Sequence, residues 1–232
     1  MRQPSIPDRL GPVTDVPETD LWSEVHDERQ ALLDLLENLA PQEWDEQTLC
    51  EQWRVRDVVG HMISGTEVKF SKVLVPLART GFRMNRFLEE DGRRRGAASP
   101  TQLLADFRAA LPRTTYPPGQ SPLTMLEDVA IHQIDIRWPL GRLRAVPLER
   151  MRLVAGYLDG NSFYPGKRLT KGLRLQATDT DWGTGDGPVV NGSIEALAMM
   201  LSGRFVALQA LHGDGVATLT SRIRGVDGRA KA

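Results

Sequence analysis

The chain has 232 residues, 41% of them hydrophobic, which is enough for one large domain or two small ones around a buried core. Its 29 Lys and Arg residues balance 30 Asp and Glu residues to a net charge of −1, so charge gives no reason to expect binding to nucleic acid or to an anionic membrane. A single cysteine, Cys50, excludes an internal disulfide. The sequence has neither a membrane-spanning apolar run nor an apolar secretory segment near its start, and we therefore expect a cytoplasmic protein.

The first part of the chain is predicted to be a lead-in followed by a helix. Residues 1–18 are rich in proline and polar side chains and are expected to be flexible. The first helix is predicted to begin after Thr19 or Asp20 and to end before Pro41. Its apolar stripe consists of Leu21, Val25, Leu32, Leu35, Leu36 and Leu39.

A second helix is predicted to begin near Val55 and to continue to about Leu77. Apolar side chains mark it at helical spacing: Val55, Val58, Val59, Met62 and Ile63. The strongly basic segment that follows, residues 79–99, is predicted to be a polar connection.

A third helix carries a clear start signal, with Ser99 as N-cap, Pro100 at the first helical position and Gln102 completing a capping box. A fourth helix contains the segment LEDVAIHQIDIRWPLG and is predicted to end near Gly141. Four helices of this length with short connections favour a four-helix bundle over residues 19–145.

The pattern changes after about residue 146. LERMRLVAGYLD is predicted to be a helix, LRLQATD and GPVVNGS short strands, IEALAMMLSGRFVALQA one or two helices, and VATLTSRI a final strand. Residues 146–232 are therefore expected to form a small α+β domain, and the predicted fold class is α+β, with the helical bundle first. A buried apolar helix of this domain is a candidate contact for a homodimer.

The fourth helix carries polar groups among large apolar residues. Asp128, His132 and Asp135 fall at positions i, i+4 and i+7, which share one face of a helix. On a solvated face this pattern would be only an exposed ion pair, worth about 0.3 kcal/mol. The apolar neighbours point in most directions, however, and a buried Asp or His is costly unless it is paired or bound to a metal. We therefore favour a functional site.

His61 is the third candidate ligand. It flanks the apolar stripe of the second helix and would meet Asp128 and His132 if the two helices are neighbours. Two imidazoles and one carboxylate are the usual protein ligands of a catalytic Zn²⁺, which keeps one position open for water. Asp135, one turn after His132, could accept the second ring N–H of that imidazole and fix its tautomer.

Three segments together resemble the mycothiol-dependent maleylpyruvate isomerase family. TLCEQWRVRDVVGHM is similar to the family pattern C-x-G-W-(S/T)-V-R-D-V-(V/L)-x-H, and EDVAIHQIDIRWPLG is similar to its second signature, an acid, three residues, His and x-x-D. LQATDTDWGTGDGPVVNGSIEALAMMLSGR resembles its small C-terminal domain. The matches cover nearly all of residues 19–225 in order, and they are more specific to the family than to one reaction.

The resemblance implies a DinB-like bundle that binds a divalent metal, usually Zn²⁺, through His61, Asp128 and His132, with mycothiol as the thiol cosubstrate. The family's characterised isomerase has Glu where this chain has Asp128, whose shorter side chain can still reach a metal. Arg54 stands where Ser or Thr commonly caps the second helix, and Gln52 replaces the usual Gly. Neither change touches the implied ligands.

The implied reactions share one nucleophile. A metal that binds the thiol would lower its pKa, and the thiolate could add to an electron-poor double bond. Release after bond rotation is isomerisation, and retention is an S-transferase reaction, so we expect an isomerase or thiol S-transferase acting on a small molecule. Two alternatives stay open: a metal-dependent hydrolase of a thiol conjugate, with Asp135 or Glu67 as general base, and a non-enzymatic metal-binding or stress-response protein.

Two arginines are further candidates for the site. Arg86, in the basic segment, could hold a substrate carboxylate, although such runs are more often solvated. Arg204 closes the LSGR signature, and the resemblance hints that an arginine of this domain reaches the pocket; its alternative role is an ion pair at a helix end. Trp53 is either a core anchor or a wall of the pocket. Cys50, just before the second helix, is assigned neither as a ligand nor as a nucleophile.

Overall fold

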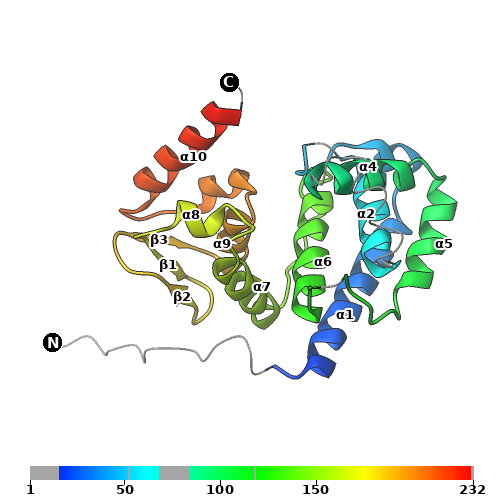
Figure 1. The fold of residues 1–232 in the computed structure, drawn as a ribbon, viewed down its shortest axis with the longest axis horizontal. Coiled ribbons are helices and arrows are strands. Elements are labelled where there is room, and N and C mark those ends of the chain that lie inside the picture. Colours follow the sequence, from blue (N-terminus) through cyan, green and yellow to red (C-terminus); the bar gives the residue numbers. More distant parts are fainter. Residues whose placement is uncertain (1–15, 52, 68–83, 118, 231–232) are drawn as a thin grey trace. The chain divides into compact units, whose positions relative to one another are not determined.

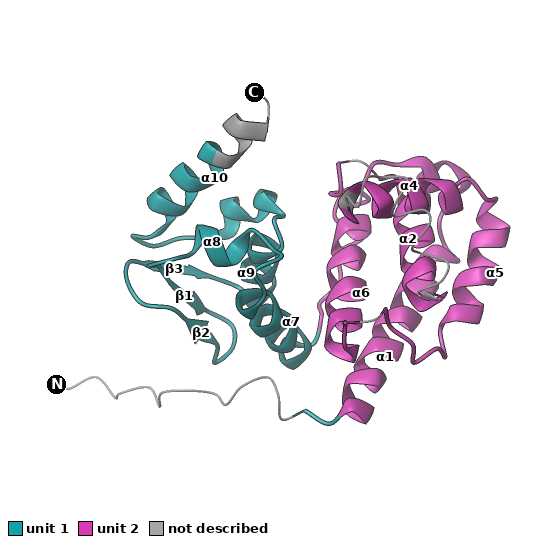
Figure 2. Ribbon diagram, in the orientation of Figure 1, with its two compact units in different colours: residues 1–17, 147–232 teal, residues 18–146 magenta. Residues whose placement is uncertain are grey.

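The computed structural model of the protein describes most of the chain: residues 16–51, 53–67, 84–117 and 119–230. These residues divide into two compact units, a larger one within residues 18–146 and a smaller one that contains residues 147–232 (Figure 2). Most of the predicted lead-in, the predicted continuation of the second helix to Leu77, and Gln52 lie outside the described residues. Within the described ranges, no helix is long and apolar enough to cross a membrane.

The larger unit is helical, as predicted. Its elements are α1 (Glu18–Leu36), the short 3-10 helix η2 (Pro41–Asp45), α2 (Val55–Glu67), α4 (Met84–Gly96), α5 (Pro100–Ala110) and α6 (Pro122–Arg137). Helix α1 packs on α6, and α2 packs on α4, α5 and α6 (Figure 1). Ser99 is the N-cap of α5, where its hydroxyl accepts the main-chain N–H of Gln102 at 3.2 Å, while the side-chain amide of Gln102 donates to Asp106.

Helix α4 lies in the segment that was predicted to be a polar connection. That prediction was wrong for residues 84–96 because the charged side chains of this segment pair along a helix. Arg86 lies 2.8 Å from Glu90, and Arg93 lies 3.0 Å from Glu89, both pairs at i,i+4 spacing. Such pairs stabilise a helix that has little apolar surface of its own.

Glycines allow α2 and α4 to approach each other closely. A Cβ atom on Gly60 of α2 would lie 2.9 Å from the main-chain oxygen of Gly92 and 2.9 Å from the main-chain nitrogen of Gly96, both in α4. A Cβ atom on Gly92 would in turn lie 3.1 Å from the main-chain oxygen of Asp57. The two helices therefore pack backbone against backbone, and this contact fixes the position of His61, the residue after Gly60.

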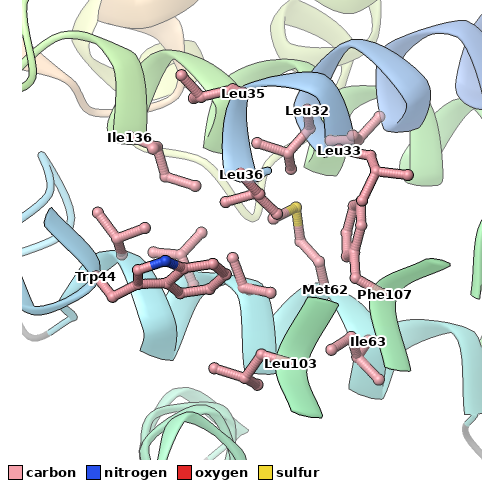
Figure 3. Close-up of a cluster of buried hydrophobic side chains, with 14 of the residues drawn as sticks. Leu32, Leu33, Leu35, Leu36, Trp44, Met62, Ile63, Leu103, Phe107 and Ile136 are labelled. Carbon is pink, nitrogen blue, oxygen red and sulfur yellow. The ribbon is translucent and has the colours of Figure 1, made fainter. Parts of the chain in front are cut away.

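The apolar stripes of the helices meet in one core (Figure 3). Buried side chains from α1, η2, α2, α5 and α6 form it, among them Leu32, Leu36, Trp44, Met62, Ile63, Leu103, Phe107 and Ile136. The side chains predicted to form the stripe of the second helix are all buried. The hydrophobic effect thus aligns α2 with α6, the two helices that carry the candidate ligands.

The smaller unit combines helices with a three-stranded sheet. Its elements are α7 (Leu148–Gly160), α8 (Gly166–Leu169), β1 (Arg174–Ala177), β2 (Gly183–Thr184), β3 (Val189–Gly192), α9 (Ile194–Leu201), η3 (Phe205–Ala210) and α10 (Val216–Ala230). The strand order is β2-β1-β3. Leu175 of β1 pairs with Thr184 of the antiparallel strand β2 and with Val190 of the parallel strand β3. The predicted α+β fold class is confirmed.

The predicted final strand was wrong, because VATLTSRI lies in the helix α10. The β-branched residues of this segment favour a strand. Leu219 and Ile223, however, are four residues apart and both buried, which is the spacing of one helix face. The other predictions for this unit agree with the structure: β1 lies in LRLQATD, β3 in GPVVNGS, and α7 in LERMRLVAGYLD.

Replacing Gly60 by Ala is expected to lower the free energy of unfolding by about 1–3 kcal/mol, because the added methyl group would meet main-chain atoms of α4 that cannot rotate away. Chemical denaturation measures the change. Gly225→Ala in α10 is the control: a Cβ atom there meets nothing within 4 Å, and the substitution should be neutral or stabilise by up to about 1 kcal/mol. Equal stability of the Gly60→Ala protein and the wild type would contradict the close helix contact.

Candidate metal centre

Helix α6 carries polar candidate residues within an almost completely buried surface. It begins at Ser121, an N-cap whose hydroxyl accepts the main-chain N–H of Thr124. Most of the 16 residues of the helix are buried, including His132, Gln133 and Asp135. Because a buried polar side chain is costly without a partner, the contacts of these residues decide what the helix can do.

Three side chains from α2 and α6 converge: His61, Asp128 and His132. Nε2 of His61 lies 3.2 Å from Oδ1 of Asp128, and Nε2 of His132 lies 3.6 Å from the same oxygen. The ligand atoms of all three lie within 4.8 Å of one another. The side chains are 14%, 23% and 10% exposed, in that order, so the cluster is shielded but still reached by solvent.

The spacing of these donors suits a small divalent metal. Zn²⁺ binds imidazole nitrogen and carboxylate oxygen at about 2.0–2.2 Å in a tetrahedron, which places neighbouring donors about 3.3–3.6 Å apart. The distances of 3.2 and 3.6 Å from Asp128 to the two imidazoles are close to this range. Three protein ligands would leave one position of the tetrahedron for a further ligand. These side chains therefore fit the metal that the sequence analysis expects.

Burial by itself would raise the pKa of Asp128. The charge and hydrogen bond of His61 oppose that effect, together with the charges of His132 and Arg29, and they lower the pKa to about 2. The carboxylate is therefore ionised at neutral pH, which is the form that binds a metal.

Asp135 and Cys50 lie behind His132. Nδ1 of His132 is 2.8 Å from Oδ2 of the completely buried Asp135, and the thiol of Cys50 donates to the same oxygen over 3.1 Å. If Nδ1 donates its proton to Asp135, Nε2 carries the lone pair on the side of Asp128. Asp135 thus stands where a residue that fixes the tautomer of His132 would have to be.

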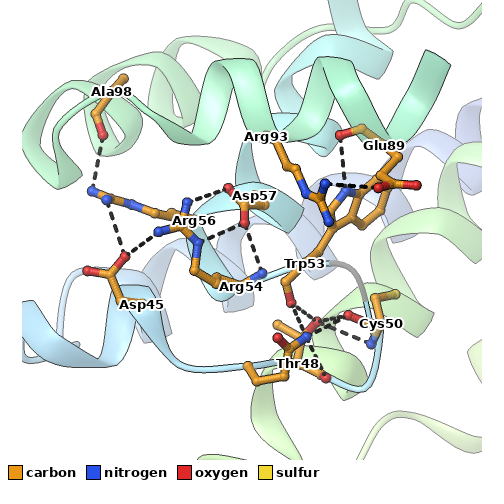
Figure 4. A network of polar contacts seen from close by, with 11 residues as sticks. Asp45, Thr48, Cys50, Trp53, Arg54, Arg56, Asp57, Glu89, Arg93 and Ala98 are labelled. Atoms are coloured by element: carbon orange, nitrogen blue, oxygen red, sulfur yellow. Dashed lines mark hydrogen bonds and ion pairs between the residues drawn. The ribbon is translucent and has the colours of Figure 1, made fainter. Parts of the chain in front are cut away.

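The loop before α2 holds Cys50 against α6. The main-chain N–H of Leu49 donates to the main-chain oxygen of Asp135 at 3.1 Å. The N–H of Trp53 donates to the oxygen of Cys50 at 2.8 Å, and the hydroxyl of Thr48 donates to the oxygen of Trp53 at 2.8 Å (Figure 4). The contact between Cys50 and Asp135 was not predicted, because a loop pattern in the sequence does not say which helix the loop meets.

Trp53 covers the two imidazoles. Its ring centroid lies 4.7 Å from that of His61 and 5.8 Å from that of His132. The indole is buried, and its N–H donates to the main-chain oxygen of Glu89 at 3.4 Å. Of the two roles considered from the sequence, the structure places Trp53 as a wall of the cluster as well as a part of the core.

Arg54 takes part in an ionic network at the start of α2 (Figure 4). Its main-chain N–H and its Nε both donate to Oδ2 of Asp57 at 3.0 Å, and its Nη1 lies 2.8 Å from Asp45. Asp57 thus caps the first turn of α2 in place of a residue at position 54. This departure from the family pattern leaves the helix start intact.

A second group of potential ligands shares His132. The ligand atoms of Cys50, His132 and Asp135 also lie within 4.8 Å of one another, with Sγ of Cys50 at 3.8 Å from Nδ1 of His132. A metal there would have to replace the hydrogen bond between His132 and Asp135. It would also lie against a carboxylate that solvent does not reach. We therefore favour the group of His61, Asp128 and His132.

The two candidate arginines have other contacts. Arg86 is exposed on α4 and pairs with Glu90, which is the solvated role considered for it from the sequence. Arg204 belongs to the smaller unit, where Nη1 donates to the main-chain oxygen of Ser202 at 2.9 Å. Their roles in a reaction stay predictions.

Comparisons with known proteins agree with the motifs in the sequence. Residues 25–117 match the family described as mycothiol maleylpyruvate isomerase N-terminal domain. A crystal structure of the mycothiol-dependent maleylpyruvate isomerase has a TM-score of 0.62 and 16% identity, and a mutant of it with a histidine changed to alanine has a TM-score of 0.64 and 15% identity. Each comparison covers 88% of this chain and 96% of the other chain. Among curated proteins, none matches. The family match covers residues 25–117 and supports the predicted family for that part of the chain, and the similar structures confirm the predicted DinB-like fold.

The wild-type protein, purified without a tag, is expected to hold about one Zn²⁺ per chain, because three protein donors suffice for a zinc site with an open position. His61→Ala and Asp128→Asn each remove one donor and should abolish stoichiometric metal. Elemental analysis measures the content, and circular dichroism confirms that the helices remain. The control is His212→Ala, which changes an exposed histidine of the smaller unit and should keep the metal.

Cys50→Ala distinguishes the two groups of ligands. The variant should retain zinc, because Cys50 contacts Asp135 and Nδ1 of His132 rather than the atoms near Asp128. Zinc lost from Cys50→Ala but kept by His61→Ala would instead assign the metal to the second group.

Proposed function

We propose that this chain, whose residues 25–117 match the mycothiol maleylpyruvate isomerase N-terminal domain, is a metal-dependent enzyme that uses a low-molecular-weight thiol to isomerise a small electron-poor molecule. The observation that supports the proposal is the convergence of His61, Asp128 and His132, with the ring of His132 oriented by Asp135. The names of the two similar crystal structures describe a mycothiol-dependent isomerase, and they support mycothiol as the thiol.

The chain's own residues would prepare the site for this chemistry. A divalent metal such as Zn²⁺, when bound, supplies the positive charge that lowers the pKa of a thiol. Asp128 would contribute one negative charge and the two imidazoles none, so the site would keep a net positive charge that favours an anionic sulfur. Asp135 would hold the proton on Nδ1 of His132 and thereby direct Nε2 toward the other two ligands. Trp53 shields His61 and His132 from water.

Isomerisation and S-transfer differ only in the fate of the new carbon–sulfur bond. In an isomerase the thiolate adds to one alkene carbon and its neighbour becomes an enolate, the molecule rotates about the former double bond, and the carbon–sulfur bond breaks again, which restores the double bond and the thiolate. In an S-transferase the bond is kept. The ligand geometry serves both reactions equally, whereas the names of the similar structures favour isomerisation, which we therefore put first.

Hydrolysis has less support, because it needs a general base beside the metal. Burial raises the pKa of Glu67, but hydrogen bonds and charge from Arg113 and Arg95 outweigh burial and lower the pKa below its usual value. Glu67 is thus tied in ion pairs and is a poor proton acceptor. Asp135 is completely buried and lies 2.8 Å from Nδ1 of His132, so it is a poor general base for water.

The test is conversion of maleylpyruvate to its trans isomer by the zinc-loaded protein, followed by absorbance with and without mycothiol. The wild type should require both the metal and the thiol. Asp135→Asn should lower kcat/KM by about 10–100-fold, since it weakens the orientation of a ligand, and His132→Ala should lower it further. His212→Ala, outside the site, should behave as the wild type.

Mass spectrometry of the reaction mixture separates the alternatives. Accumulation of an S-conjugate in place of the trans isomer would identify a transferase. Absence of both products, with mycothiol and with glutathione, would overturn the enzymatic proposal and leave a metal-binding protein without activity.

A further inference from the structure

A buried arginine lines a pocket beside the candidate metal centre. Arg29 of α1 is only 5% exposed, and it shares the pocket with Asp128. The remaining walls are mainly apolar: Met62, Thr66, Phe107, Ala110, Met125 and Val129. The space inside the pocket is small, about that of one water molecule, which suits an oxygen atom of a small polar group.

Main-chain atoms and an aromatic ring hold the guanidinium in place. Nη1 of Arg29 donates to the main-chain oxygen of Arg113 at 2.7 Å and to that of Leu111 at 3.4 Å. The guanidinium carbon lies 5.9 Å from the ring centroid of Trp22. Among the described residues, Arg29 makes no ion pair with a carboxylate, and its hydrogen bonds use Nη1 alone.

This arrangement leaves the buried positive charge without a direct ion pair in the described part of the chain, since Asp128 acts on it only through its charge across the pocket. Burial lowers the pKa of Arg29 from 12.5 to about 10, against the opposing effect of Asp128, so the group is still charged at neutral pH. Carbonyl dipoles stabilise the charge but do not neutralise it. The edge formed by Nε and Nη2 can donate two parallel hydrogen bonds, the geometry that a carboxylate accepts.

We propose that Arg29 binds a carboxylate of a small ligand in this pocket, beside the metal, and thereby selects substrates that carry a carboxylate. That this ligand is the substrate rests on the proposed function. The binding of an anion by Arg29 does not rest on it. The residue differs from the two arginines that the sequence analysis considered, Arg86 and Arg204.

Asp128 makes anion binding dependent on the metal. The carboxylate of Asp128 lies on the same pocket as Arg29 and repels a second carboxylate as long as its charge is not offset. A metal bound to Asp128 would offset it. Zinc should therefore strengthen anion binding, and by thermodynamic linkage the anion should strengthen zinc binding by the same factor.

The test is calorimetric titration of the full chain with succinate, an unreactive dicarboxylate, and with neutral succinamide as its control. The wild type should bind succinate more tightly with zinc than without it, and it should not bind succinamide. Arg29→Met should weaken succinate binding by about 10–100-fold, both with zinc and without it. The matched control is Arg108→Met in α5, whose guanidinium pairs with the exposed Glu37 and whose loss should change nothing.

A purely structural role of Arg29 predicts a different result. If Arg29 only ties α1 to the end of α5, Arg29→Met should lower the melting temperature and leave succinate binding intact, which would overturn the proposal. If Arg29→Met does not fold, Arg29→Lys decides: it keeps the charge but not the bidentate edge, and it should still bind succinate about tenfold more weakly. The proposal would be overturned if the wild type and Arg29→Lys bound succinate equally well. It would also be overturned if the wild type did not bind succinate at all.

The same titrations separate this proposal from the proposed function. Arg29→Met should retain the zinc content of the wild type, since Arg29 is not one of the converging ligands. If the wild type holds no zinc but still binds succinate through Arg29, the result contradicts the proposed metal-dependent function and supports the anion site. Binding seen only with zinc and unchanged in Arg29→Met would assign the anion to the metal, and it would overturn the proposal for Arg29.

Discussion

The burial of α6 is the constraint on which the site depends. A helix buried along most of its length must find a partner for every polar side chain, and several of these partners come from other elements. His61 of α2 meets Asp128, and Cys50 of the preceding loop meets Asp135. Gln133 donates to the main-chain oxygen of Glu28 in α1 at 2.8 Å and to its carboxylate. The apolar packing of α6 and the hydrogen bonds of its polar side chains therefore require the same position of the helix.

The position of α2 follows from a second constraint, the contact with α4. Because Gly60 lets the two backbones touch, α2 has little freedom to rotate or slide. Met62 and Ile63 on the same turn are buried in the core, which holds the helix from another side. His61 thus reaches Asp128 from a rigid helix and not from a loop, which is the kind of support that a precise ligand site needs.

The sequence was sufficient for the features that repeat along a helix and insufficient for those that depend on contact between elements. Apolar spacing predicted most helices, and the positions of Asp128, His132 and Asp135 predicted their common face. The helix α4 was missed because its stability comes from ion pairs and from glycines that fit another helix. Arg29 was missed although it stands on the apolar face of the first helix between Val25 and Leu32, where a charged residue is itself a signal.

The two carboxylates around His132, those of Asp135 and Asp128, differ in burial and therefore in the role that each can take. Asp135 is completely enclosed, lies within hydrogen-bond distance of Nδ1 of His132, and accepts the thiol of Cys50. Asp128 is partly exposed and lines the pocket that also holds Arg29, so it can exchange a histidine contact for a metal. One carboxylate is therefore placed to orient the imidazole and the other to act as a ligand, although both lie on the same helix.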